Sequence, residues 1–499
     1  MIEQGTTLEK RSTMTKTRKK PELLIPASNL EVLKVAVIFG ADAVYIGGEA
    51  FGLRAKAKNF SMADMAEGIA FAHDHGVKVY VTANILAHND DLPEIRKYFQ
   101  ELKVIKPDAL IISDPGVFQI ALEKCPEIER HISTQANNTN YGTYHFWHQL
   151  GAKRVVSARE LSLAELKEIR ANIPPEMEME TFIHGAMCIS YSGRCLLSNY
   201  MTNRDANQGA CTHPCRWKYS IVEEERPGEY FPVFENERGT YIFNSKDLCM
   251  IEHIPALMES GIDSFKVEGR MKTALYVATV ARTYRKAIDD YIKGIEVYQA
   301  NMPWYLEQIA NCTYRQFTTG FFFDKPDETT QIYDSNTYVQ ESVYLGIVEN
   351  VSNCKVKDLL SSREELLSSR EELLDYKNKS IGDKGELSNE KEKLLDGKEK
   401  LHRGKEKISS DKDGLQVDKI VKWYKIEQRN KFSVGESIEI MKPGGENLST
   451  KVLYILSEEG EEMESAPHPQ QVLYVALDKK AEEYDLLRRT VHRKQLSPR

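Results

Sequence analysis

The sequence predicts an α/β protein in which a TIM-barrel-like (β/α)8 domain precedes a small C-terminal β-barrel domain. The chain has 499 residues, enough for an α/β barrel of ~250 residues and a further domain. From residue 21 to about 290, short β-rich runs alternate with helical stretches, which is the pattern of a parallel sheet with crossover helices. Beyond Phe323 the pattern changes to alternating β segments separated by glycine turns.

The predicted barrel strands are eight short runs of apolar and β-branched residues. Glycine turns precede several of them, as in FGADAVYIGG from Phe39 and SGIDSFKVEG from Ser260, where glycine supplies the left-handed end of the preceding helix. The strands are Glu22–Pro26, Ala43–Gly47, Lys78–Asn84, Ala109–Ser113, His131–Gln135, Arg154–Ser157, Thr181–Gly185 and Ser264–Gly269. Because periodicity does not show closure, a doubly wound open sheet is the alternative.

Changes in composition divide the chain into segments. We expect a disordered basic N-terminus at 1–20, the barrel at 21–323 with a long cysteine loop at 186–260, and a basic tail at 481–499. The C-terminal β domain is expected at 338–354 and 416–480. Between these two parts lies a charged insert, 355–415, in which SSREELL occurs twice in succession. We interpret the insert as a solvated, partly helical spacer, with a short coiled coil as the alternative.

Composition excludes a membrane protein and indicates a reducing compartment. The chain has 67 Lys and Arg against 75 Asp and Glu, a net charge of −8, and 41% hydrophobic residues. No run of ~20 apolar residues could span a bilayer. The N-terminus is basic and has no apolar core, so it does not resemble a secretory signal. We therefore expect a cytoplasmic protein, whose clustered cysteines are metal ligands or redox groups rather than disulfides.

Four of the eight cysteines are clustered: Cys188, Cys195, Cys211 and Cys215. Their spacing is C-x6-C, then fifteen residues, then C-x3-C. Zinc sites typically use narrower C-x2–4-C pairs, so the wide first arm favours an iron–sulfur cluster; zinc and unmetallated thiols remain alternatives. Cys249 is a further candidate ligand that competes with Cys215.

Polar residues stand at the ends of the predicted strands, where a (β/α)8 barrel carries its functional face. Lys266 and Glu268 alternate with Val267 and should point to the same side of their strand. The candidate catalytic residues are His184, Lys266, Glu268 and Arg270, and the candidate substrate-binding residues are Arg54, Asn84, Gln135 and Asn137. A structural ion pair, such as Arg270 with Glu268, is the alternative for the charged members.

The run Glu180–Ser198, ETFIHGAMCISYSGRCLLS, resembles the signature of the collagenase-like peptidase family. Further matching segments are GADAVYIGG at 40–48, STQANNTN at 133–140, NQGACTHPCRW at 207–217 and FKVEGR at 265–270. Within the family, the chain is most similar to the branch of tRNA hydroxylation proteins, which carries the C-terminal β domain.

The resemblance implies prephenate-dependent 5-hydroxylation of the wobble uridine in tRNA. It implies a 4Fe-4S cluster on Cys188, Cys195 and Cys211, with the fourth ligand from Cys215 or Cys249. The implied partners are tRNA, a small anionic cosubstrate and a partner protein of the same family. Arg54 and Arg270 suit the anion, because guanidinium binds carboxylate through two hydrogen bonds.

Proteolysis is the alternative function. The sequence has neither H-E-x-x-H nor G-x-S-x-G. A cysteine protease would need a histidine base, and His184 and His213 lie near the cysteines in sequence. However, a thiol bound to iron is not available as a nucleophile.

RNA binding is not indicated by the acidic net charge but by local basic segments. These are Lys10–Lys20 and a C-terminal group of Arg488, Arg489, Arg493, Lys494 and Arg499. Trp217 and Tyr219 either stack on bases or pack in the core.

Overall fold

The computed structural model describes twelve stretches of the chain. They are residues 20–48, 60–188, 190–192, 194–204, 206, 210–217, 220–222, 230–232, 246–312, 316–324, 342–349 and 423–490. Several predictions lie outside these residues: the N-terminal segment up to residue 19, Arg54, Tyr219, the insert 355–415 and the end of the chain beyond 490.

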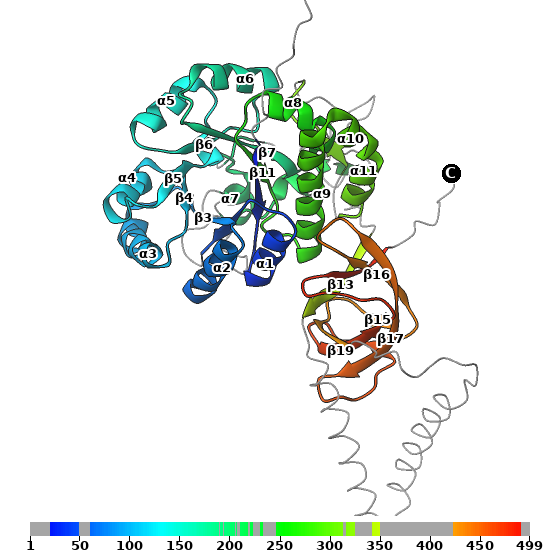
Figure 1. Ribbon diagram of the computed structural model, residues 1–499. Helices are drawn as coiled ribbons and strands as arrows, with labels where there is room; N and C mark the ends of the chain where they lie inside the picture. Colours follow the sequence, from blue (N-terminus) through cyan, green and yellow to red (C-terminus); the bar gives the residue numbers. More distant parts are fainter. Residues whose placement is uncertain are drawn as a thin grey trace, which may run out of the picture. The chain divides into compact units, whose positions relative to one another are not determined.

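Eight parallel strands close into a barrel, which confirms the predicted fold class (Figure 1). Each strand pairs with its predecessor in the order β1 to β7, and β11 closes the barrel between β7 and β1. The strands are β1 Glu22–Pro26, β2 Ala43–Gly47, β3 Lys78–Ala83, β4 Ala109–Ile112, β5 Glu129–Ile132, β6 Arg154–Val156, β7 Glu178–Ala186 and β11 Ser264–Val267. All eight overlap the predicted runs, and the pairing of β11 with both β1 and β7 excludes the open sheet.

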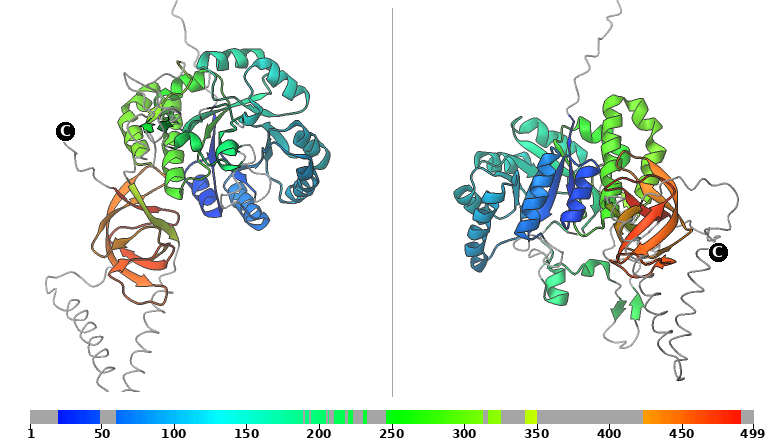
Figure 2. Two further views of the ribbon diagram at one scale, coloured as in Figure 1. Left: turned by 180° about the vertical axis from the view of Figure 1, so that it is seen from behind. Right: turned by 60° about the horizontal axis from the view of Figure 1, so that its bottom comes forward.

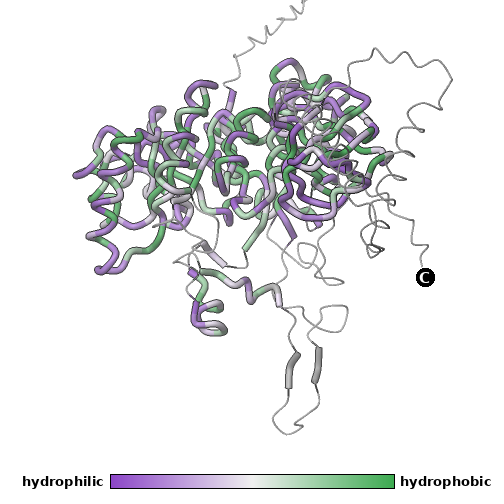
Figure 3. Tube along the Cα trace, turned by 90° about the horizontal axis from the view of Figure 1, so that it is seen from below, coloured by the Kyte–Doolittle hydropathy of each residue, from purple (hydrophilic) through white to green (hydrophobic). Residues whose placement is uncertain are grey.

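Helices surround the barrel on the outside (Figure 2). They are α1 Leu30–Ile38, α2 Met62–Asp74, α3 Leu92–Ile105, α4 Pro115–Lys124, α5 Tyr141–Gln149, α6 Leu163–Asn172, α8 Ile254–Glu259 and α9 Ala274–Lys293, followed by α10 Ile295–Ala300 and α11 Met302–Ala310. Local sequence sets their starts: Asp114 accepts a hydrogen bond from the Val117 amide at the start of α4, with Pro115 in the first turn. Hydrophobic and hydrophilic positions alternate along the chain, as expected of elements with one buried face (Figure 3).

Strand β7 contains an irregularity that matters for the site. Its register against β11 pairs Phe182 with Lys266 and then His184 with Val267, so Ile183 is an extra residue in β7. Glu180 and Phe182 therefore share a face with Lys266. His184 shares the opposite face with Val267.

The long excursion after β7 starts and ends at one place on the barrel. Strand β10, Asp247–Cys249, runs antiparallel to the end of β7, and Asp247 pairs with Ala186. A two-residue strand, β12 Phe317–Thr318, pairs with β10 on its other side. The excursion contains the short helix α7, Leu197–Thr202, which projects from the barrel end (Figure 2, right).

The second unit is a closed antiparallel barrel with strand order β13-β14-β19-β17-β16-β20. Its strands are β13 Ser342–Glu349, β14 Trp423–Glu427, β16 Ser437–Met441, β17 Asn447–Ser457, β19 Val472–Leu477 and β20 Leu486–Thr490. Buried apolar side chains such as Leu345, Ile440 and Val475 fill its core.

The expected domain end at residue 480 is corrected, because β20 lies beyond it and pairs with β16. Arg488 is buried and its Nε donates to Glu439 Oε2 at 2.9 Å. Arg489 is paired with Glu436 at 2.6 Å. Both arginines are engaged inside the β domain, so they are not part of a solvated basic tail.

Candidate active site

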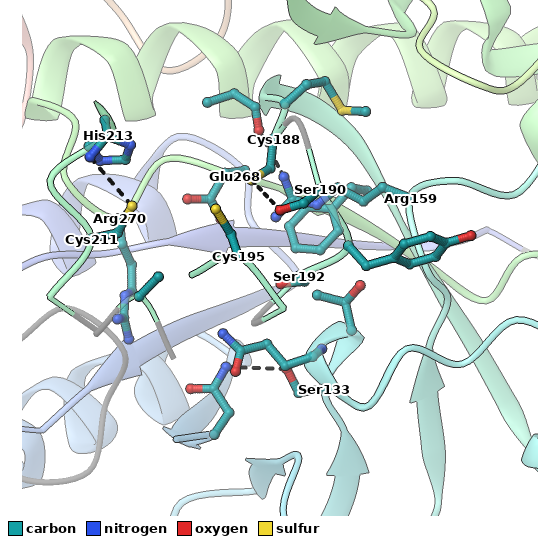
Figure 4. A pocket seen from close by; sticks show the side chains of 18 of the residues that line it. Ser133, Arg159, Cys188, Ser190, Ser192, Cys195, Cys211, His213, Glu268 and Arg270 are labelled. Atoms are coloured by element: carbon teal, nitrogen blue, oxygen red, sulfur yellow. Dashed lines mark hydrogen bonds between the residues drawn. The ribbon is translucent and has the colours of Figure 1, made fainter. Parts of the chain in front are cut away.

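A cavity of about 290 Å³ lies at the carboxyl ends of the barrel strands (Figure 4). Parallel strands in a barrel deliver the residues after each strand to this one end. Its walls come from β2, β3, β4, β7 and β11, from the segments after β5 and β6, and from the cysteine-containing excursion.

Four cysteines line this cavity: Cys188, Cys195, Cys211 and Cys215. Figure 4 shows the first three around it, with Arg159, Glu268 and Arg270. Cys249 does not line the cavity. It is on β10, its Sγ is 3.8 Å from Tyr284 Oη, and burial raises the pKa of its thiol to about 11. The position of Cys249 favours Cys215 as the fourth ligand candidate beside Cys188, Cys195 and Cys211.

Thr212 holds the cysteine segment together. Its amide donates to Ser198 Oγ at 3.1 Å, and its hydroxyl lies 3.2 Å from Ser198 Oγ and 3.1 Å from Thr202 Oγ1. Ser198 and Thr202 belong to α7, so these contacts fix α7 to the stretch that carries Cys211 and Cys215. The next amide, of His213, donates to Cys211 Sγ at 3.4 Å.

The thiols suit a soft metal or an iron–sulfur cluster in kind and number. In the part of the chain that the structure describes, no three cysteine, histidine or carboxylate side chains are close enough to hold a metal ion. The cavity therefore collects four thiols, although no three of them are as close together as the ligands of a single metal ion.

A buried ion network reaches the cavity floor through Lys266. Lys266 Nζ donates to Glu180 Oε1 at 2.7 Å, and Arg154 Nη1 donates to Glu180 Oε2 at 3.0 Å. Burial would raise the pKa of Glu180, but Lys266 and Arg154 outweigh it and hold this pKa below its usual value. Lys266 also lies over the Tyr45 ring, with 4.6 Å from Nζ to the ring centre. Lys266 is thus fixed at the cavity floor by its ion pair with Glu180.

Arg270 and Glu268 line the cavity, as does Lys266. Arg270 is buried and donates to Thr82 Oγ1 at 2.7 Å. A Cβ added at Gly47 would lie 2.4 Å from Arg270 Nη1, so glycine at the end of β2 makes room for this guanidinium. Tyr45 Oη donates to the Val267 backbone oxygen at 2.9 Å and lies 3.4 Å from Glu268 Oε2.

Two amide side chains on the wall have unused acceptors. Asn84 Nδ2 donates to Ser133 Oγ at 3.2 Å, whereas Asn84 Oδ1 and Gln135 Oε1 are buried and have no hydrogen-bond partner among the described residues. Both residues line the cavity. Because buried acceptors are normally satisfied, this pair points to a ligand that donates hydrogen bonds. Asn137, the third predicted amide, is not part of the lining, and its Nδ2 donates to the backbone oxygen of Gln135.

His184 lies outside the cavity, which corrects the prediction that it acts there. The extra residue in β7 turns it towards α9, where its ring packs on Tyr276 and Tyr284. Its Nδ1 is 3.3 Å from Tyr284 Oη, and burial lowers the pKa of His184 to about 3. In this position His184 cannot serve as the base of a cysteine protease in the cavity.

Arg159 is a cavity residue that the sequence did not reveal. It follows β6, its guanidinium lies 4.1 Å from the centre of the Phe182 ring, and its Nη1 donates to the Ala186 oxygen at 2.8 Å. The available signal was its place just after a predicted strand. That signal was weak, because Arg159 and Glu160 together have the composition of an exposed loop.

The fold and the site together define a class of protein. It is a (β/α)8-barrel protein that has a thiol-rich cavity at the carboxyl ends of its strands and a second, antiparallel β-barrel domain. Residues 28–332 match the model of peptidase family U32, and residues 414–488 match the model of the peptidase family U32 C-terminal domain. The chain belongs to peptidase family U32, which confirms the family resemblance.

Three relatives illustrate where the chain stands within this family. It is 35% identical to tRNA hydroxylation protein P1 of Bacillus subtilis over 94% of this chain and 95% of that protein. It is 40% identical to tRNA hydroxylation protein P of Escherichia coli over 63% of this chain and 77% of that protein. It is 36% identical to the 23S rRNA 5-hydroxycytidine C2501 synthase of Escherichia coli over 56% of this chain and 41% of that protein.

Proposed function

We propose that this protein is an RNA-modifying enzyme that hydroxylates C5 of the wobble uridine in tRNA, with prephenate as cosubstrate. Relatives named for tRNA hydroxylation and for 5-hydroxycytidine synthesis support the reaction class. The observation that carries the proposal is a single cavity in which the guanidinium groups of Arg159 and Arg270 lie beside four cysteine thiols.

The cationic side chains suit a small dianion. Prephenate has two carboxylates, and each can accept paired hydrogen bonds from a guanidinium group. Arg159 and Arg270 stand on the segments after β6 and β11, so they reach the cavity from two places on its rim. Lys266 adds positive charge at the floor, where Glu180 fixes its direction.

The amide wall suits a hydrogen-bond donor. Asn84 Oδ1 and Gln135 Oε1 can accept from a hydroxyl group of the cosubstrate or from N3–H of a uracil ring. Either bond would satisfy an acceptor that is otherwise buried alone, which is a source of discrimination against ligands without that donor.

Cys188, Cys195, Cys211 and Cys215 would hold a 4Fe-4S cluster. When bound, such a cluster supplies electron-transfer chemistry next to the anion-binding groups. The chain's own residues bind and orient the cosubstrate. Burial of Arg270 and Lys266 strengthens their attraction for its carboxylates.

The test is nucleoside analysis of tRNA from a host whose own tRNA hydroxylation genes are deleted. Expression of this chain should restore 5-hydroxyuridine derivatives, and the Arg270→Met variant should restore far less. Phe146→Ala, an exposed position on α5, is the matched control and should act like the unchanged protein. Absence of hydroxylated uridine after expression of soluble, metal-replete protein would contradict the proposal.

A further inference from the structure

The excursion between β7 and β10 carries an unusual concentration of exposed apolar side chains. Sixteen large hydrophobic side chains are exposed in the described part of the chain, and five of them lie between residues 191 and 217. They are Tyr191, Leu196, Tyr200, Met201 and Trp217. Tyr200 is 84% exposed and Leu196 75%. Three of the five are aromatic, so this part of the excursion presents aromatic rings to solvent.

The charge of the same stretch is opposite to that of the whole protein. Between Cys188 and Trp217 the sequence has three arginines, Arg194, Arg204 and Arg216, and one acidic residue, Asp205, whereas the chain carries a net charge of −8. Arg194 and Arg204 are exposed. Interleaved aromatic rings and arginines are the combination that binds single-stranded nucleic acid, by stacking on bases and pairing with phosphates.

The surface is braced and continuous with the cavity. The hydrogen bonds of Thr212 to Ser198 and Thr202 fix α7, which carries Tyr200, to the stretch that ends at Trp217. The amide of Arg194 donates to the Tyr191 oxygen at 3.1 Å, which closes a turn at the rim. Tyr191 is both exposed and part of the cavity lining. A base that leaves this surface would enter the cavity beside Tyr191.

We infer that Tyr191, Arg194, Tyr200, Arg204 and Trp217 form an RNA-binding surface that stacks the unpaired bases of a tRNA loop and delivers one of them to the cavity. This inference rests on the proposed function and adds the place where the RNA binds. It assigns recognition to the cysteine excursion, not to the terminal basic segments. Trp217 is 45% exposed, so it is not part of the core.

Binding of unmodified transcripts to the full chain tests the inference. The probes are an anticodon stem-loop RNA with a wobble uridine and a fully paired hairpin of the same length. The unchanged protein should prefer the stem-loop. Tyr200→Ala and Trp217→Ala should each weaken stem-loop binding about fivefold or more, because each removes one stacking platform. Arg204→Ala should lower the slope of log Kd against log salt by about 0.7, the share of one phosphate contact.

Controls separate binding from folding and from the proposed function. Phe146→Ala and Lys97→Ala change an exposed ring and an exposed charge on the outer helices α5 and α3, and should leave Kd unchanged. Melting temperature and the visible absorbance of each variant show whether the fold and the bound group are intact.

Each outcome decides one question. Unchanged RNA affinity in Tyr200→Ala and Trp217→Ala, with hydroxylation restored by the parent chain, overturns the inference and leaves the proposed function standing. A parent chain that binds no stem-loop RNA and restores no hydroxylation overturns both. If the two substitutions instead change the sedimentation coefficient and leave RNA affinity unchanged, the surface joins two copies of this chain and the inference is overturned.

Discussion

Lys266 and Glu180 form a hydrogen-bonded ion pair in the barrel interior, with 2.7 Å between Lys266 Nζ and Glu180 Oε1. Both side chains are almost fully buried, and they stand on paired strands, β11 and β7. Glu180 also accepts from Arg154, so one carboxylate fixes two cations. Because a buried cation is costly without a partner, Glu180 decides whether the cavity floor can be positively charged.

Glu180→Gln should therefore destabilise the barrel domain by about 3–5 kcal/mol, because it removes the carboxylate that pairs with buried Lys266, whereas Arg154 keeps Glu22 and Glu178. Urea unfolding monitored by circular dichroism measures the loss. Glu178→Gln is the matched control: Glu178 bonds the same Arg154 at 2.6 Å but is partly exposed, and its loss should cost about 1 kcal/mol. Equal losses of unfolding free energy in the two variants would show that burial of the carboxylate does not determine how strongly its ion pair stabilises the fold.

Glu22 should govern part of the acid unfolding of the barrel. Burial opposes its ionisation, but Arg154 prevails and lowers the pKa of Glu22 to about 2. Since the folded pKa lies below the unfolded value, the stabilisation is fully present above about pH 4.5 and is lost as the pH falls towards 2. The loss amounts to roughly 3 kcal/mol. Stability measured by urea unfolding between pH 5 and 2 should thus have a flatter slope in Glu22→Gln, whereas Glu94→Gln, on the exposed side of α3, should keep the parent slope.

The cysteine assignment predicts which thiols hold the chromophore. After anaerobic purification, Cys188→Ala, Cys195→Ala and Cys215→Ala should each lose the broad absorbance near ~400 nm and the bound iron, because each removes a thiolate from the cluster. Cys249→Ala should keep both, because Cys249 faces Tyr284 outside the cavity.

The control for the cysteine series is Cys125→Ala, at the end of α4, where burial raises the pKa of the thiol to about 11. This variant should retain iron. Loss of iron in Cys249→Ala together with retention in Cys215→Ala would reverse the assignment of the fourth ligand. A colourless parent protein that contains zinc would contradict the iron–sulfur proposal.

Gly47 should control the cosubstrate site through Arg270. Gly47→Ala places a methyl group 2.4 Å from the present position of Arg270 Nη1, so the guanidinium must move. We expect at least a tenfold higher KM for prephenate with a smaller change in kcat, because the anion loses a positioned partner. Gly444→Ala, where an added Cβ meets nothing within 4 Å, should leave both constants unchanged. Unchanged KM in Gly47→Ala would argue that Arg270 does not contact the anion.

Strands and cysteines could be predicted because their signals are local. Each barrel strand is a short apolar run bounded by turn residues, and the cysteine spacing is visible without any fold. Strand β20 was missed because LLRRT contains two adjacent arginines, which suggested a tail. Only the tertiary fold shows that Glu439 is positioned to neutralise Arg488 inside the β domain.

The position of His184 could not be predicted for a different reason. Strict alternation places His184 on the same face as Glu180 and Phe182, which point into the barrel. The extra residue, Ile183, reverses that face, and an isoleucine is equally compatible with either side of a buried strand. Cys249 on β10 pairs in register with His184. The same change of face therefore goes together with the position of Cys249 outside the cavity.

The pairing of Ala186 with Asp247 has a consequence for how this family diversifies. Because the excursion departs and returns at neighbouring backbone positions, its ends stay joined whatever length of chain lies between them, and closing a longer loop adds only a small entropic cost. The excursion is in this sense an exchangeable module on a constant barrel. A chimera that grafts the corresponding stretch of a relative between Ala186 and Asp247 should fold on this barrel and take on the donor's choice of RNA.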